Sequence, residues 1–168
     1  MLLWIGVALA ILVIVILLSI VLLDLSRTDT QRRNLDRSVM SVLSVALTAM
    51  SESAQHNQRQ ARGHLDPAAR GKVNLGDWQR LSLEYWKLVA AHPPKALVQA
   101  KLLERLADVT SRAHQVNYAI ESRDLMRASI PADAPDEQVR ALDEEVQQTC
   151  KRLLDELEEV ARQVQELK

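Results

Sequence analysis

The hydrophobic positions of this chain form one unbroken run at the start and a helical repeat thereafter. From Leu2 to Leu23 no residue is charged and Ser19 is the one clearly polar side chain, before Asp24 ends the run. Because an α-helix rises about 1.5 Å per residue, these residues make a helix of about 33 Å, long enough to cross a bilayer core of about 30 Å. The pattern predicts a transmembrane anchor over residues 1–24.

A cleaved signal peptide is the alternative interpretation of this run. Such a peptide has a basic start, an apolar region of about 7–15 residues and a cleavage motif of small residues. Here no Lys or Arg precedes the run, the run is longer, and residues 22–25 contain no small side chain. These features favour an uncleaved span.

Basic residues indicate the direction of the span, because Lys and Arg concentrate on the cytoplasmic side. None lies on the short N-terminal side, whereas four arginines follow the run: Arg27, Arg32, Arg33 and Arg37. We therefore expect these arginines beside the lipid headgroups, the N-terminus outside and the remaining chain in the cytoplasm, in a membrane such as the bacterial inner membrane.

A helical repeat follows the anchor directly. Leu35, Val39, Val42, Ala46 and Met50 are spaced by 4, 3, 4 and 4 residues, and no Gly or Pro occurs between residues 7 and 62. This spacing places the five side chains on one helix face. It predicts a juxtamembrane helix over residues 25–62 that continues the anchor.

Helix breakers divide the rest of the chain. Three of the four glycines and Pro67 lie within residues 63–76, which we interpret as a linker. Proline pairs at 93–94 and at 131 and 135 then separate the helices of a predicted bundle over residues 77–168. The expected helices are residues 77–91, with Asp77 as N-cap, 95–129 and 136–167.

The last two predicted helices carry heptad seams, in which apolar residues alternate at spacings of 4 and 3. The first seam contains Leu102, Leu106, Val109, Ala113, Val116 and Ile120, and the second contains Val146, Cys150, Leu153, Leu157, Val160, Val164 and Leu167. A short connection with two prolines favours an antiparallel hairpin within one chain. A parallel homodimeric coiled coil is the alternative, and both hold if two bundles pair.

Composition supports a helical fold. The chain has no Phe, 3% aromatic residues and four glycines, whereas helix-forming residues dominate. We predict an all-α protein: one transmembrane helix that continues into a helical segment, followed by a small bundle with a C-terminal antiparallel hairpin or coiled coil.

Charge is divided unevenly although the net charge is −1. Residues 24–105 contain 13 Lys or Arg and 8 Asp or Glu, a net +5, whereas residues 106–168 contain 8 and 14, a net −6. The acidic half either docks a basic partner or forms a solvated helix face, on which Glu158 and Arg162 have the spacing of an ion pair. A nucleic-acid partner is not expected, because the basic residues crowd toward the membrane.

Candidate chemistry is sparse. The four histidines are scattered without metal-ligand spacing, and no phosphate-binding loop or nucleophile motif occurs. Cys150 occupies a seam position, where a thiol packs as a small apolar group. An intermolecular disulfide and a redox-active thiol remain alternatives for Cys150. We expect no enzyme activity, metal or cofactor.

These features favour a membrane-anchored scaffold, adaptor or assembly subunit that presents a cytoplasmic bundle to a protein partner. The predicted partner interface combines the aromatic residues of the first bundle helix with the last seam: Trp78, Tyr85, Trp86, Cys150, Leu153, Leu157, Val160, Val164 and Leu167. Homo-oligomerisation through this seam is a further possibility. The alternatives are a transmembrane signal relay and an envelope spacer whose bundle lies outside the cytoplasm.

Overall fold

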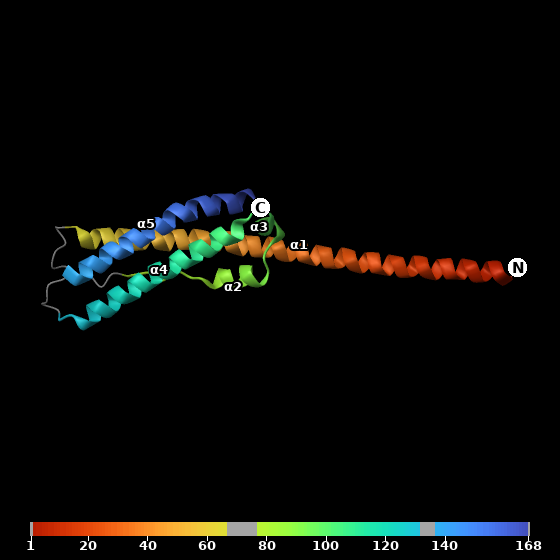
Figure 1. Cartoon of the computed structure of the whole chain (residues 1–168), viewed down its shortest axis with the longest axis horizontal. Coiled ribbons are helices and arrows are strands. Elements are labelled where there is room, and N and C mark those ends of the chain that lie inside the picture. Colours follow the sequence, from red (N-terminus) through yellow and green to blue (C-terminus); the bar gives the residue numbers. More distant parts are fainter. Residues whose placement is uncertain (1, 67–76, 132–136, 168) are drawn as a thin grey trace. The chain divides into compact units, whose positions relative to one another are not determined.

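Helices are the secondary structure of the part of the chain that the structure, a computed structural model, describes. It describes residues 2–66, 77–131 and 137–167, with side chains from residue 27 onward. These ranges contain no strand and five helices, α1 (Leu2–Leu65), α2 (Glu84–Ala91), α3 (Lys95–Gln99), α4 (Leu102–Ser129) and α5 (Glu137–Glu166), in the order drawn in Figure 1. The predicted all-α class is confirmed for the described residues.

The chain divides into two compact units, residues 1–38 and residues 39–168. In the first unit the four arginines at 27, 32, 33 and 37 are exposed, and Arg33 Nη2 pairs with Asp29 Oδ2 at 2.8 Å. The predicted span at residues 2–23 lies outside the residues whose side chains are described. Among the side chains described, no helix is both long and apolar enough to cross a bilayer.

The core of the second unit is built by three heptad seams. The seams predicted on α4 and α5 are buried, apart from the partly buried Leu167. The third seam, called the α1 seam here, contains Leu43, Leu47, Met50, Ala54, Asn57 and Ala61, spaced by 4, 3, 4, 3 and 4 residues and all buried. The long helices α1, α4 and α5 therefore pack together through matching apolar stripes.

The α1 seam differs from the stripe predicted for this helix. Val39 and Met50 are buried as expected, but Val42 and Leu35 are exposed. Val42 immediately precedes Leu43 and therefore lies about 100° around the helix from the α1 seam, and Leu35 lies in the first compact unit, before the bundle begins. The residues from Val39 onward belong to the compact unit that contains the bundle, although the sequence assigned residues 25–62 to a separate segment.

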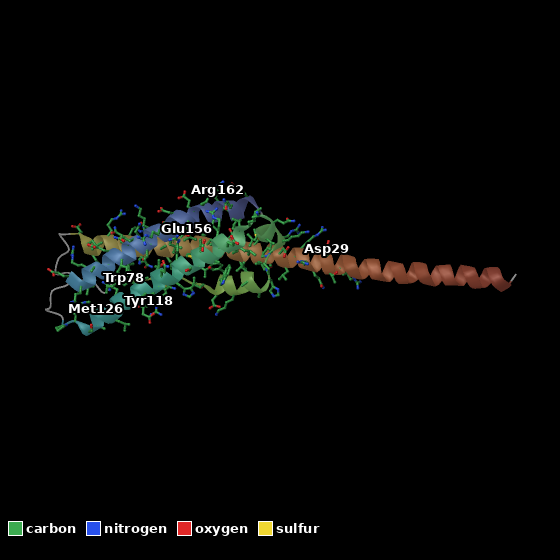
Figure 2. The ribbon with its side chains drawn as sticks, in the orientation of Figure 1. Asp29, Trp78, Tyr118, Met126, Glu156 and Arg162 are labelled. Atoms are coloured by element: carbon green, nitrogen blue, oxygen red, sulfur yellow. The ribbon has the colours of Figure 1, made fainter. Side chains whose placement is uncertain are left out.

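Helices α4 and α5 form an antiparallel hairpin within one chain. Ion pairs between them run in opposite sequence directions: Arg105 with Glu159, Arg112 with Glu156 and Arg123 with Asp143. Glu156 is labelled on α5 in Figure 2. Arg162 pairs with Glu159 and Glu166 rather than with the expected Glu158. The α4 and α5 seams therefore pack against each other within one chain, as the short connection predicted.

Several predicted helices have other boundaries in the structure. The helix expected over residues 77–91 begins only at Glu84, so Asp77 is not its N-cap, and residues 77–83, called the strap here, form no helix. The helix expected over 95–129 is broken at Lys101, whose φ of 56° is left-handed and ends the short α3 before α4 begins. The helix expected at 136–167 is α5. Helix α1 runs to Leu65 and so extends into the predicted linker at residues 63–76. Residues 67–76 of that linker lie outside the described residues.

Candidate functional site

The residues predicted as a partner interface are mostly inside the protein. Tyr85, Cys150, Leu153, Leu157, Val160 and Val164 are buried in the core, and Trp78, Trp86 and Leu167 are partly buried against it. The structure brings Tyr85 and the α5 seam into one core rather than onto one surface. These apolar side chains therefore hold the bundle together, and their role as a partner interface stays a prediction.

Tyr85 shows how the core satisfies a polar group. Its hydroxyl lies 2.9 Å from Thr110 Oγ1, and the Thr110 hydroxyl donates to the Leu106 carbonyl oxygen at 2.7 Å. Because Thr110 has one hydroxyl hydrogen, Tyr85 is the donor to Thr110. Burial raises the pKa of Tyr85, which keeps the phenol protonated as this contact requires.

Cys150 is a packing residue. Its side chain is 0% exposed, and burial raises the pKa of its thiol to about 12. A thiol must ionise to act as a nucleophile. At neutral pH the native Cys150 is therefore both shielded and protonated, which disfavours the redox and disulfide alternatives.

The strap is held on its main chain by side chains of α1 and α4. Asn57 of α1 accepts from Gln79 N at 2.9 Å and donates to Gln79 O at 2.7 Å. Asn117 of α4 makes the same pair of bonds with Leu81, at 2.8 and 2.9 Å. His56 Nε2 lies 2.8 Å from Asp77 O. Alternate residues thus turn their main-chain groups toward the helices, as in an extended chain.

A buried polar cluster lies where α1, the strap, α4 and α5 meet. Arg123 is 1% exposed and Asp143 2%, and Arg123 Nε donates to Asp143 Oδ1 at 2.6 Å. Arg123 Nη2 is 3.2 Å from His64 Nδ1, and its guanidinium carbon is 4.7 Å from the Trp78 ring centre. Such a pair is stable only when both charges are present, because an isolated buried charge is costly.

Arg140 of α5 joins the end of α1 to this cluster. Its two terminal nitrogens donate to the carbonyl oxygens of His64 and Leu65, at 3.1 and 2.8 Å. The last carbonyls of a helix have no partner within the helix and carry partial negative charge. A guanidinium therefore both satisfies and neutralises this end of α1.

An apolar groove of about 490 Å³ lies between α1 and the chain from the strap into α2. Its α1 wall is made of small and apolar residues and its other wall of polar ones, with Tyr85 at the second wall. The lining residues are Ser41, Val42, Val45, Ala46, Ala49, Met50, Ser53, Arg80, Ser82, Glu84 and Tyr85. Val45 is 68% exposed, so the chain leaves apolar surface uncovered here. We call this region the Val45 groove.

The chemistry available in the Val45 groove is that of binding. Apolar walls with a few polar groups suit an apolar side chain or segment. Among the described residues, no three His, Cys, Asp or Glu side chains are grouped closely enough to hold a metal ion. No separate sequence signal indicated the groove, because Val42 and Ala46 belonged to the stripe predicted to lie on one face of this helix.

No family model, curated protein or solved structure matches this chain.

Proposed function

We propose that this protein is a membrane-anchored scaffold that holds a protein partner at its helical bundle. The apolar run at Leu2–Leu23 supports the anchor, and the arginines that follow it support a cytoplasmic bundle. Anchoring confines any bound partner to the membrane surface and so raises its local concentration without new contacts. The protein acts by tethering rather than by catalysis.

The Val45 groove is the observation that supports a partner most directly. The bundle buries three seams in its own core, yet Val42 and Val45 remain exposed beside Ala46 and Ala49. Apolar surface in a concave site is typical of protein and ligand contacts. The partner in this proposal inserts apolar side chains between α1 and Tyr85.

Photocrosslinking in native membranes tests the groove. A photoreactive residue replaces Val45 in the full chain, and the control carries it at Leu125 of α4, which is 67% exposed. We expect one discrete protein adduct from position 45 and none of that mass from position 125. Both positions are apolar and exposed, so the pair separates a specific site from general stickiness.

A second substitution tests whether the adduct at position 45 depends on the groove. Ala49→Glu places a carboxylate in the groove, whereas Thr48→Glu changes an exposed neighbour that does not line it. Burying an unpaired charge is costly, so Ala49→Glu should reduce the position-45 adduct at least tenfold, while Thr48→Glu leaves it unchanged. An adduct that also forms from position 125, or that survives Ala49→Glu, contradicts this function.

A further inference from the structure

The strap is bound to the bundle in the way that a helical protein binds a separate extended peptide. Asn57 and Asn117 each contact both main-chain groups of one strap residue, and His56 contacts a third. We propose that the seat of the strap between α1 and α4 is a peptide-binding site, and that a partner's extended segment exchanges with the strap. The strap also lines one wall of the Val45 groove through Arg80 and Ser82, but its exchange with a partner's segment goes beyond the tethering function.

The Asn contacts recognise any extended chain. An Asn amide presents one acceptor and one donor group, which match the N–H and C=O of a single residue. These four bonds depend on the strap's backbone, because Asn57 and Asn117 contact no strap side chain through them. The seat therefore supplies affinity for an extended main chain, as in strand-addition sites.

Two side-chain positions supply specificity. Trp78 lies over the Arg123 guanidinium, with its ring 5.7 Å from the His64 ring in an edge contact. Leu81, three residues later, is buried in the core. Gln79, Arg80 and Ser82 are exposed. The ligand class is thus an extended peptide with an aromatic residue followed by leucine at the third position after it.

The strap is well placed to exchange. It lies outside the three seams, and four of its seven side chains are exposed: Asp77, Gln79, Arg80 and Ser82. Leu81 is the one strap side chain buried in the core, and segments with few buried side chains open locally at lower free energy than the core. A competing segment with the same chemistry restores every bond that the strap releases.

Two proline variants of the full chain separate the held strap from a released one. Gln79→Pro removes the N–H that donates to Asn57 without changing a buried side chain, and proline suits an extended backbone. Arg80→Pro is the matched control, because no contact of Asn57, Asn117 or His56 involves Arg80. The probe is a fluorescein-labelled peptide with the sequence of residues 77–83, added to each chain in detergent micelles.

We expect the probe to bind the Gln79→Pro chain saturably, and at least tenfold more tightly than it binds the wild-type or Arg80→Pro chain. Adding Asn117→Ala to the Gln79→Pro chain should remove this binding, and a probe with proline at the Gln79 position should not bind. Equal binding to all chains overturns the proposal. A Gln79→Pro chain that forms dimers by light scattering also overturns it, because the occupant is then a second copy.

Hydrogen exchange of the wild-type chain keeps the proposal testable if Gln79→Pro fails to fold. The amides of Gln79 and Leu81 should exchange at least a hundredfold faster than those of Val116 and Leu153 in the core. If all four amides exchange at the same rate, the strap opens only with the whole bundle and does not exchange with a ligand.

Discussion

Replacing Asp143 by Asn should destabilise the bundle by about 3–5 kcal/mol, because Arg123 then loses its buried counter-charge and keeps only the exposed carboxylate of Asp124. The substitution keeps the volume of the side chain, so charge rather than a cavity causes the loss. Urea unfolding of the full chain, followed by the accessibility of the buried Cys150 thiol, measures the change. Asp155→Ala is the control on the same helix, since Asp155 is exposed, and should change stability by less than about 0.5 kcal/mol.

A double variant separates a need for charge pairing from a general need for these residues. Arg123→Met with Asp143→Leu removes both charges and leaves apolar groups in the same place. Because well-packed apolar replacements of buried ion pairs are often neutral or stabilising, this double variant should recover most of the loss caused by Asp143→Asn alone. A double variant as unstable as the single one would show that the cluster acts through other contacts, such as that of Arg123 with Trp78.

Leu47→Ala should destabilise the bundle by about 2–5 kcal/mol, because it opens a cavity in the α1 seam. Leu47 is 1% exposed and packs in the same core as the α4 and α5 seams. The same urea experiment with Cys150 of α5 as reporter measures whether a change in α1 reaches the hairpin. The effect arises only if α1 is the third helix of the bundle.

Val45→Ala is the matched control for Leu47→Ala. The two residues are two positions apart on α1, but Val45 lines the groove and is mostly exposed. Its truncation should change stability by less than about 0.5 kcal/mol. Equal effects of the two substitutions would contradict the packing of the α1 seam against α4 and α5.

The sequence predicted the hairpin well because Leu and Val repeat there at strict 4 and 3 spacings. The α1 seam escaped prediction because its second half consists of Ala54, Asn57 and Ala61, which carry little hydrophobic signal. Small side chains let helices approach closely, and Asn57 is buried because it bonds the strap. Its burial depends on a tertiary contact that no local pattern encodes.

The strap forms no helix although Trp78, Leu81 and Tyr85 have helical spacing. Tertiary bonds from Asn57 and Asn117 replace the helical hydrogen bonds of this segment and hold it out of a helix. The predicted interface residues are apolar and regularly spaced, which is also what a core requires. The Val45 groove depends on which face of α1 is buried, and this depends on tertiary packing.

The central claim, an anchored bundle on the cytoplasmic side, is tested most directly by labelling one new thiol. Gln165→Cys adds an exposed thiol to α5, while the wild-type chain is the control, because its Cys150 is buried and reacts only after denaturation. Intact cells are treated with a membrane-impermeant maleimide, and the membrane fraction is then washed with alkaline carbonate. We predict that the Gln165→Cys chain stays in the washed membranes and that its new thiol is labelled only after the cells are permeabilised. Labelling of the new thiol in intact cells, or release of the chain by the wash, would contradict the claim.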